Sequence, residues 1–325
     1  MVKLATAEQS AQKKATRAAF GVTLAELAAE GVPVVAVDAD LTGSTTTKKF
    51  AQACPENADR LFNCGIAEQD MIDVAAGLSL TGNIAYTGSF AVFGTGRVYD
   101  QIRNTVCYSN LNVKIAPTHA GISVGPDGGT HQMLEDVALM RVLPNMKVLV
   151  PADYAAARAA LRLAAQTPGP VYVRMGRATV PCVYADDVEL ELGRAYVLRE
   201  GTDVTIVANG VEIREALVAA DLLTEQGISA EVIDAFSVKP LDEETIDLIV
   251  KDHKLIVTLE ENVLAGGYGE KVNNYITKRR YNVKVTNIGL PDEYIEHGNV
   301  DILKKETGID TDTIVKRIIA DRAVL

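Results

Sequence analysis

The chain has 325 residues, 48% of them hydrophobic, which is enough to fill the cores of two ordinary domains. Its formal net charge of -11 disfavours nucleic acid and anionic membranes as partners, because both require clustered Lys and Arg, but it leaves room for a small anionic substrate. No apolar run approaches the roughly 20 residues of a membrane span, the first residues lack an apolar signal core, and the cysteines form no CxxC pair, so we expect a cytoplasmic protein without a disulfide framework.

The first part of the chain alternates predicted helices and strands. Phe20, Leu24 and Leu27 share one face of a helix that ends at Gly31, and a second helix follows Glu68. Such alternation predicts an α/β fold with a mostly parallel sheet covered on both faces, in which the loops after the strands gather at one edge. Strands are expected at residues 34–37, 84–86, 113–116, 148–150 and 171–173, and further helices at 96–108 and 152–166.

A stretch of little periodicity separates this part from a second α/β unit. We therefore expect two doubly wound α/β domains, at residues 1–180 and 194–325, joined by a linker at 181–193. The Gly-rich segment 266–269 follows the acidic pair Glu260 and Glu261, which would repel a phosphate, so it is interpreted as the entry to a helix. Strands of the second unit are expected at 204–208, 230–234, 255–259 and 283–288, with helices at 213–226 and 311–320.

Glu68 lies between a Gly-containing turn and an apolar run of helical spacing. An acidic residue in the first turn of a helix is favoured by the helix dipole, and this is one interpretation. A carboxylate fixed at this position is also suited to be the proton partner of a heterocyclic cofactor. Phe90 and Phe93 leave a similar choice, since two aromatic side chains three residues apart can stack on a flat ring or share a core-facing helical surface.

A loop at residues 118–132, here called the Gly/His loop, combines two histidines with four glycines. Glycines let the backbone approach a ligand closely, and the imidazoles of His119 and His131 can donate hydrogen bonds to oxygens or move protons near neutral pH. No third ligand stands at helical spacing beside them, so a metal site is not predicted. Arg17 and Arg177, which flank the first unit, each carry a planar guanidinium that can clamp a phosphate.

Several segments of the chain form a combination that is typical of one family. They are the Gly/His loop and the segments Asp-Ala-Asp-Leu-Thr-Gly-Ser (38–44), Gly-Ile-Ala-Glu-Gln-Asp-Met (65–71), Gly-Ser-Phe-Ala-Val-Phe (88–93), Leu-Pro-Asn-Met (143–146) and Leu-Glu-Glu-Asn-Val-Leu-Ala-Gly-Gly-Tyr-Gly (259–269). With these segments in this order, the chain resembles the carboxy-terminal half of transketolase along essentially its whole length. The resemblance implies a pyrimidine-binding domain followed by the smaller transketolase carboxy-terminal domain, with thiamine diphosphate as the cofactor.

The resemblance also implies roles for particular residues. Glu68 would contact N1′ of the aminopyrimidine, Phe90 and Phe93 would stack on that ring, and Asp40 matches an acidic residue near the thiazolium. A further aromatic residue, often found three positions after the second Phe, is Gly96 here. Glu68 and His131 are the expected catalytic residues. Substrate contacts are expected from Arg17, Ser44, His119 and Arg177 to the sugar phosphate, and from Asp127 and His131 to sugar hydroxyls.

One part of the family's cofactor site is missing from the sequence. Enzymes of this kind hold Mg²⁺ and the diphosphate with a Gly-Asp-Gly motif and a later Asn, and the chain lacks this pair. The resemblance therefore implies a separate amino-terminal transketolase subunit that binds Mg²⁺ and completes the site, in a heterotetramer of two plus two chains. No metal ligand is expected in this chain itself.

The implied reaction is the transfer of a two-carbon ketol unit from a ketose phosphate to an aldose phosphate. Three alternatives stay open: the beta subunit of a 2-oxo acid dehydrogenase, a deoxyxylulose-phosphate synthase, and a non-catalytic scaffold subunit. The two histidines of the Gly/His loop favour transketolase over the dehydrogenase, and the synthase carries its diphosphate site in the same chain. The joint presence of Glu68, His119, Asp127 and His131 argues against a scaffold.

Overall fold

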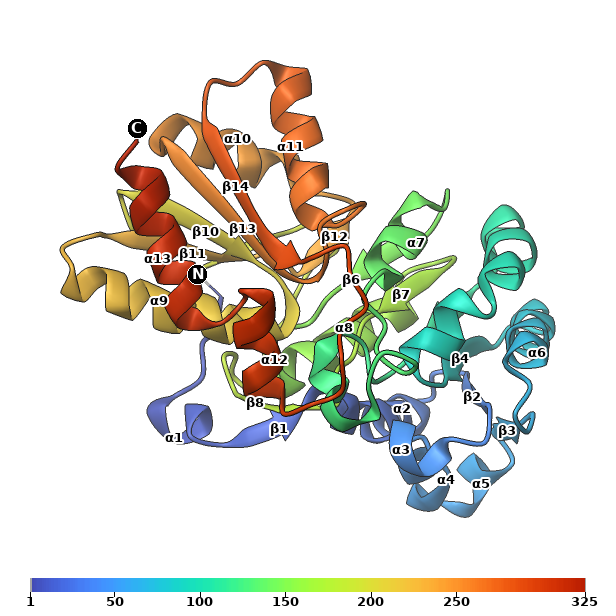
Figure 1. Cartoon of the computed structure of the whole chain (residues 1–325). Helices are drawn as coiled ribbons and strands as arrows, with labels where there is room; N and C mark the ends of the chain where they lie inside the picture. Colours follow the sequence, from blue (N-terminus) through green and yellow to red (C-terminus); the bar gives the residue numbers. More distant parts are fainter. Residues whose placement is uncertain (1, 325) are drawn as a thin grey trace.

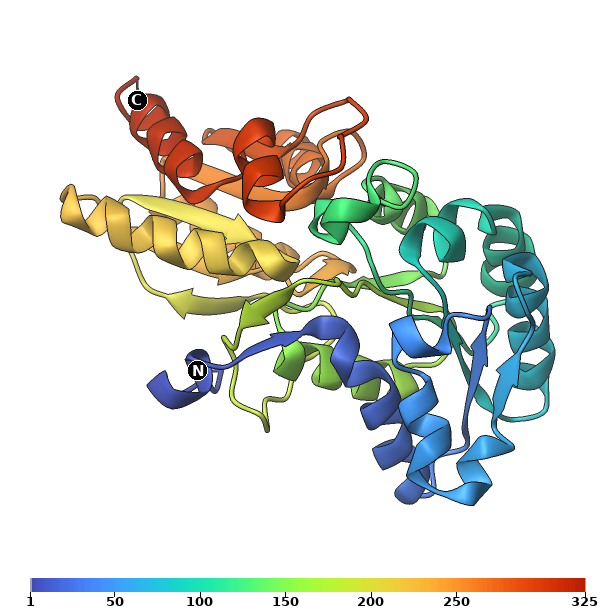
Figure 2. The ribbon, with the colours of Figure 1, turned by 60° about the horizontal axis from the view of Figure 1, so that its bottom comes forward.

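In the computed structural model, which describes residues 2–324, two α/β units lie side by side (Figure 1). The first runs from blue to green and the second from yellow to red, and the turned view in Figure 2 keeps them adjacent. The predicted α/β class is confirmed, since helices accompany a mostly parallel sheet in each unit. No helix in the described part of the chain is long and apolar enough to cross a membrane.

The larger sheet has seven strands in the order β12-β6-β7-β5-β4-β2-β3. The strands from β6 to β3 run parallel, and β12 pairs antiparallel with β6 at the edge. Each strand predicted for the first unit is found close to its expected bounds, whereas β3 and β12 are too short to show a period in the sequence. The strands are β2 (Val34–Asp38), β3 (Leu61–Asn63), β4 (Ile84–Gly88), β5 (Val113–Ile115), β6 (Lys147–Leu149), β7 (Val171–Val173) and β12 (Ser237–Lys239).

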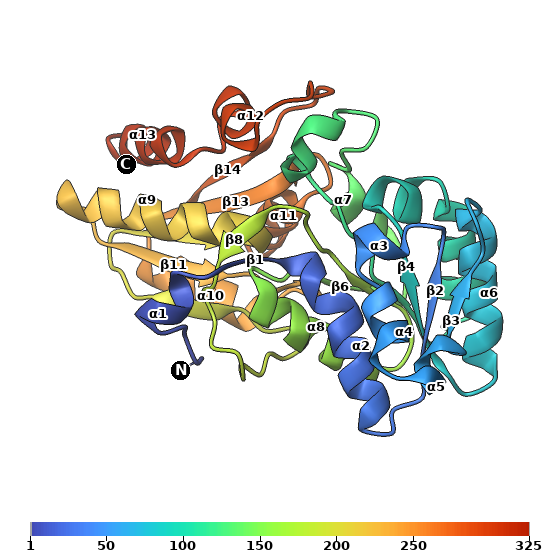
Figure 3. The same cartoon turned by 90° about the horizontal axis from the view of Figure 1, so that it is seen from below.

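Helices cover both faces of this sheet. Alternate residues of β2 point to opposite faces, so that Val34 and Ala36 share a core with α2 (Phe20–Ala29) and α8 (Tyr154–Gln166), whereas Val35 and Val37 share one with α6 (Glu68–Leu80). Figure 3 shows α2 and α8 on one side of the strands and α6 on the other. The shorter helices of this unit are α1 (Ala7–Ser10), η1 (Thr16–Ala19), α3 (Thr42–Thr45), α4 (Lys48–Ala53), α5 (Pro55–Ala58), η4 (Ile122–Asp127) and α7 (Asp136–Val142).

The helix expected at residues 96–108 differs from the prediction. It begins earlier and is wound as two π-helical pieces, η2 (Val92–Gly96) and η3 (Gln101–Tyr108). Glycine weakens an α-helix, and both Gly94 and Gly96 fall in the first piece. Since π-helical turns are rare and occur frequently at functional sites, this segment is a candidate for function.

The smaller sheet has five strands in the order β14-β13-β10-β11-β9, parallel except for β9. All four strands predicted for the second unit are found, but β13 continues past its expected end at residue 259, toward the first unit. The elements are β9 (Tyr196–Arg199), β10 (Val204–Ala208), η5 (Gly210–Glu212), α9 (Ile213–Glu225), β11 (Ala230–Asp234), α10 (Glu243–Asp252), β13 (Leu255–Val263), α11 (Tyr268–Arg279), β14 (Lys284–Leu290), α12 (Val300–Thr307) and α13 (Thr311–Arg322).

The Gly-rich segment of the second unit is the entry to α11, as predicted. The carboxylate of Glu260 accepts hydrogen bonds from the backbone N–H groups of Tyr268 and Gly269, each 2.8 Å long. An acidic side chain thus satisfies N–H groups of the first helical turn that have no partner within the helix. The N-terminus of α11 is occupied by the protein's own carboxylate.

The two units are joined by more than a linker. β1 (Lys13–Ala15) pairs antiparallel with β8 (Thr179–Pro181), and β12 of the second unit extends the first sheet. In the expected linker, the hydroxyl of Tyr184 donates a hydrogen bond of 2.6 Å to the buried carboxyl group of Asp234. Both large hydrophobic cores contain residues of each unit. The domain bounds stay a prediction, and the packing across them is continuous.

Candidate active site

Glu68 is the first residue of α6, and a short loop joins it to the end of β3. Its side chain is only 3% exposed, and one carboxylate oxygen lies 3.0 Å from Nη1 of Arg97. Arg97, which directly follows η2, is about half exposed, and its guanidinium carbon lies 4.3 Å from the centre of the Phe93 ring. A buried carboxylate and an aromatic face therefore lie side by side, and one arginine covers both.

Four aromatic side chains gather next to this ion pair. The rings of Phe90 and Phe93 are stacked, with centroids 6.1 Å apart and planes 14° apart. The ring of His119 stacks on Phe90 at 3.8 Å, and the ring of His131 meets Phe93 edge-on at 5.4 Å. Both phenylalanines are half-buried and lie outside the hydrophobic cores, so their interpretation as a pair of core side chains is not supported.

Backbone hydrogen bonds join the Gly/His loop to the segment that carries Phe90 and Phe93. The N–H of Thr118 donates to the carbonyl of Ser89 over 2.9 Å, and the Thr118 hydroxyl lies 2.7 Å from Nδ1 of His119. Burial, assisted by the charges of Arg17 and Arg177, lowers the pKa of His119 to about 3. The imidazole is therefore neutral at physiological pH, and it can offer a ligand hydrogen bonds but not a full positive charge.

Arg17 and Arg177 line one groove of about 560 Å³ between the two units. Arg17 donates to the carbonyl of Ser44 over 2.7 Å, and Arg177 donates to the carbonyl of Val124 over 2.6 Å. Within residues 2–324 neither guanidinium has a carboxylate partner, whereas Arg214, in the same groove, is paired with an acid of α9. The groove thus presents both of these guanidinium groups to an incoming anion.

The remaining predicted residues, Asp40 and Asp127, are exposed. Asp40 has a left-handed φ of 62°, and its carboxylate accepts a hydrogen bond of 3.4 Å from the amide of Asn63. The same Asn63 side chain accepts from the N–H of Gly65 over 2.9 Å, which links the Asp40 loop to the turn before Glu68. Asp127 is exposed at the end of η4.

The predicted residues therefore fall into three places. The structure brings together Glu68, Phe90, Phe93, His119 and His131, and it places Arg17, Ser44 and Arg177 at the neighbouring groove. Asp40 and Asp127 are exposed, and the structure does not show them in contact with these residues.

Two residues of this region had no role in the sequence analysis. Apart from its position directly after Gly96, nothing in the sequence marks Arg97 as a functional residue, because its partner Glu68 is distant in sequence. Asp38 is fully buried at the end of β2, and its carboxyl group accepts hydrogen bonds from Thr45 and Thr47 hydroxyls. Burial raises the pKa of Asp38, although these hydrogen bonds oppose the shift. Asp38 therefore shapes the loop that carries Asp40 and Ser44, and its signal was its position within the segment 38–44.

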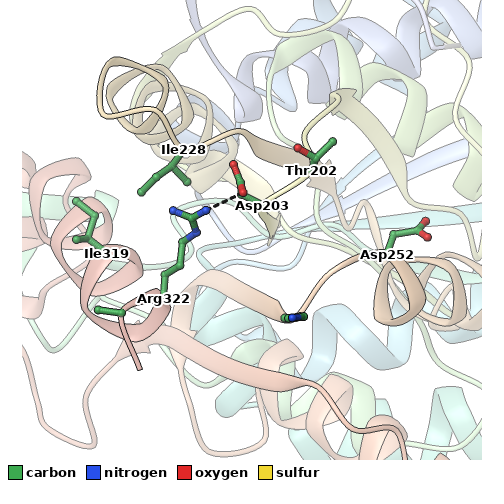
Figure 4. A pocket seen from close by; sticks show the side chains of 8 residues that line it. Thr202, Asp203, Ile228, Asp252, Ile319 and Arg322 are labelled. Carbon is green, nitrogen blue, oxygen red and sulfur yellow. Dashed lines mark hydrogen bonds and ion pairs between the residues drawn. The ribbon is translucent and has the colours of Figure 1, made fainter. Parts of the chain in front are cut away.

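A second hollow, of about 620 Å³, lies in the carboxy-terminal unit and is shown in Figure 4. Thr202 and Asp203 line it just before β10 begins, and Arg322 pairs with Asp203 over 2.7 Å. It lies at the amino ends of the parallel strands, whereas ligands of such sheets bind at the carboxyl ends. We therefore place the candidate site at Glu68 and the adjoining groove.

Two family models match the chain. The first, "Transketolase, pyrimidine binding domain", matches residues 12–182, and the second, "Transketolase, C-terminal domain", matches residues 193–314. Both are domains of thiamine diphosphate-dependent transferases. The chain belongs to the transketolase family, and it corresponds to the carboxy-terminal section of those enzymes.

Individual relatives agree with this family. The chain is 44% identical to a "Putative transketolase C-terminal section" of Methanocaldococcus jannaschii, over 95% of this chain and 96% of that protein. It is 39% identical to one of the subunits of an apulose-4-phosphate transketolase of Phocaeicola vulgatus, over 93% of this chain and 96% of that protein. A 1-deoxy-D-xylulose-5-phosphate synthase of Desulforudis audaxviator is also 39% identical, over 91% of this chain but only 46% of the synthase.

A solved structure has the same fold at similar identity. It is a split-gene transketolase, described as an inactive beta4 tetramer, with 45% identity and a TM-score of 0.85. The match covers 95% of this chain and 98% of that chain.

Proposed function

We propose that this chain is one subunit of a thiamine diphosphate-dependent transketolase. It transfers a two-carbon ketol unit from a ketose phosphate to an aldose phosphate, and a separate amino-terminal subunit supplies the half of the site that binds Mg²⁺ and the diphosphate. The observation that carries the proposal is the buried Glu68 carboxylate beside the stacked rings of Phe90 and Phe93, next to a groove with two arginines free of carboxylate partners among residues 2–324.

The residues present fit the aminopyrimidine half of the cofactor. A buried carboxylate can hold the proton of a ring nitrogen, and a half-buried phenylalanine ring is suited to stack on a flat heterocycle once the partly exposed Arg97 leaves the face of Phe93. Glu68 would hold the proton at N1′, Phe90 and Phe93 would orient the ring, and Asp40 would lie on the thiazolium side. Thiamine diphosphate supplies, when bound, the cleavage and formation of the carbon–carbon bond.

The diphosphate half of the cofactor is assigned to the amino-terminal subunit. Among the described residues, no group of three or more His, Cys, Asp or Glu side chains is arranged to hold a metal ion. In the proposal, Mg²⁺ is bound mainly by the amino-terminal subunit. The near-complete match to a chain of a split-gene transketolase supports the same arrangement.

Recognition of the sugar phosphate is assigned to the groove and the Gly/His loop. Arg17 and Arg177 would bind the phosphate as cations, with Ser44 and the neutral His119 adding hydrogen bonds. Asp127 and His131 would meet sugar hydroxyls near the reacting carbons. The imidazole of His131 lies edge-on against Phe93, and it would accept or return a hydroxyl proton of the substrate there.

The proposed assembly contains two copies of this chain and two amino-terminal subunits, in the cytoplasm. The relative solved as a beta4 tetramer is described as inactive, which supports the idea that a chain of this kind associates with itself yet needs its partner for activity.

Reconstitution with the amino-terminal subunit tests the proposal. The two chains are co-expressed, and the purified complex is supplied with thiamine diphosphate, Mg²⁺, xylulose 5-phosphate and ribose 5-phosphate. We expect ketol transfer by the complex and none by either chain alone. Release of carbon dioxide from pyruvate would instead indicate a 2-oxo acid dehydrogenase subunit, or, when it requires glyceraldehyde 3-phosphate, the synthase. No reaction despite bound cofactor would indicate a scaffold.

A further inference from the structure

The end of β13, in the carboxy-terminal unit, reaches the Gly/His loop of the amino-terminal unit. The carboxylate of Glu261 accepts a hydrogen bond of 2.8 Å from the backbone N–H of Ser123. Gly121 has a left-handed φ of 78°, and a Cβ at this position would overlap the Glu261 carboxylate. The loop backbone and the carboxylate therefore fit each other without room for a side chain.

The same strand also holds the chain just after the loop. The amide of Asn262 donates to the carbonyl of Leu134 over 3.0 Å, and the backbone N–H of Val263 donates to that carbonyl over 3.0 Å as well. Ser123 and Leu134 lie on either side of the segment that carries Asp127 and His131. Successive residues of β13 thus form hydrogen bonds with both ends of this segment.

The Glu261 carboxylate is held in place by a buried arginine. Arg174 lies 3.3 Å from it and donates a hydrogen bond of 2.9 Å to the carbonyl of the same residue. Arg174 is also paired with Asp136 over 2.8 Å, and all three side chains are at most 6% exposed. A buried charge pair with several hydrogen bonds restricts its members to one geometry, so Glu261 presents its second oxygen to Ser123 in a defined position.

The outer side of the loop is covered by the carboxy-terminal unit too. The amide of Gln132 donates to the carbonyl of Glu296 over 3.3 Å, and the N–H of Gly298 donates to the carbonyl of Gly125 over 3.4 Å. Figure 2 shows α12, in red, beside the green segment that contains η4. The loop is therefore held in part by a unit to which the proposed function assigns no substrate contact.

We propose that Glu261 is a positioning residue through which the carboxy-terminal unit holds the Gly/His loop in the shape that recognises the sugar phosphate, an inference that rests on the proposed function. Glu261 does not touch the substrate itself. It fixes the backbone at Gly121 and Ser123. His119 lies just before these two residues in the chain, and Asp127 and His131 follow them.

Hydrogen exchange on the full chain tests the positioning without reference to activity. We compare wild type with Glu261→Ala, which leaves the Ser123 N–H unpaired, and with the milder Glu261→Gln, in case the alanine variant fails to fold. Glu260→Gln is the matched control, because Glu260 is its equally buried neighbour but caps α11. We expect exchange in residues 121–134 to rise about tenfold in the Glu261 variants and to stay near wild type in Glu260→Gln.

Steady-state kinetics of the reconstituted complex provide the second measurement. A variant that merely unfolds lowers the amount of active enzyme and so lowers kcat without changing KM. A displaced loop instead raises KM for the sugar phosphate, and we expect an increase of about tenfold in Glu261→Gln with a smaller change in kcat. Unchanged exchange in the loop, or an unchanged KM, overturns the inference. If the wild-type complex transfers no ketol unit, the proposed function fails, whereas the exchange experiment still decides whether Glu261 positions the loop.

Discussion

The guanidinium of Arg97 pairs with the buried carboxylate of Glu68 at 3.0 Å while it lies over the face of Phe93. The Arg97 side chain thus contacts two of the three residues to which the aminopyrimidine is assigned, Glu68 and Phe93. Arg97 also directly follows Gly96, the position at which the resemblance leads one to expect an aromatic residue. Binding of the cofactor by Glu68 and Phe93 would therefore require that Arg97 give up at least part of these contacts.

Substitution of Arg97 tests this competition. In Arg97→Met the ion pair is gone, and the cofactor no longer has to displace a partly exposed arginine, an interaction of about 1 kcal/mol. We expect the Kd for thiamine diphosphate, measured on the reconstituted complex by titration calorimetry, to fall about fivefold. Arg103→Met, a change at an exposed arginine of η3, serves as the control. Weaker binding by Arg97→Met shows that the arginine assists the cofactor instead.

The groove makes a separate prediction about the substrate phosphate. Arg17→Ala and Arg177→Ala each remove a cation that has no carboxylate partner within residues 2–324, and we expect each to raise KM for sugar phosphates about 10- to 100-fold. Arg214→Ala is the matched control, because Arg214 lines the same groove but is already paired with Glu215. An equal rise in KM for all three variants contradicts the assignment, since it indicates that the phosphate responds to the overall positive potential of the groove and not to two particular arginines.

The neutral state of His119 predicts how stability depends on pH. Its pKa is lowered to about 3 by burial and by Arg17 and Arg177, so between that value and its ordinary 6.5 only the unfolded chain binds the proton. The contribution of the neutral His119 to the free energy of unfolding is therefore fully present above pH 6.5, and it is lost as the pH falls toward 3. His119→Gln should lose less stability than wild type between pH 7 and pH 5 in thermal denaturation, whereas the exposed His297→Gln should follow wild type. A slope unaltered in His119→Gln contradicts the buried, neutral assignment.

For Asp234, at the junction of the two units, we expect stability to depend on pH in the opposite direction. Burial raises its pKa from 3.8 to about 8, so the folded chain keeps a proton that the unfolded chain releases. The resulting stability is present below about pH 4 and is lost as the pH rises through 8. Asp234→Asn keeps an acceptor for the Tyr184 hydroxyl and should lose less stability than wild type from pH 6 to pH 9. Asp252→Asn, at an exposed carboxylate, is the control, and parallel curves for all three proteins contradict the prediction.

The sequence predicts the regular elements well for a physical reason. The strands β7 and β10 are found at the predicted residues, because buried parallel strands are nearly continuous apolar runs. The strand β12 could not be predicted, since three residues carry no period and its pairing depends on the first sheet. The same limit applies to η2, where glycines and the local packing produce π-helical winding in place of the expected helix.

The candidate site shows the same division between local and distant signals. Glu68, His119 and His131 could be chosen because glycines and helix starts mark their segments in the sequence. Arg97 and Glu261 could not be assigned roles, because each acts through a partner that only the fold brings near. The alternative interpretation of Glu68 as an ordinary first-turn acid is correct for its position in α6 but does not explain its burial beside an aromatic ring.

Turnover by Glu68→Gln in the reconstituted complex tests the central proposal most directly. Glutamine keeps the size of the side chain but cannot hold the proton at N1′, so we expect assembly to be intact and kcat for ketol transfer to fall by about two to four orders of magnitude. Asp70→Asn, at an exposed carboxylate in the same helical turn, should stay within about twofold of wild type, as is usual for surface substitutions. Near-normal turnover in an assembled, cofactor-loaded Glu68→Gln complex would contradict the proposed role of Glu68.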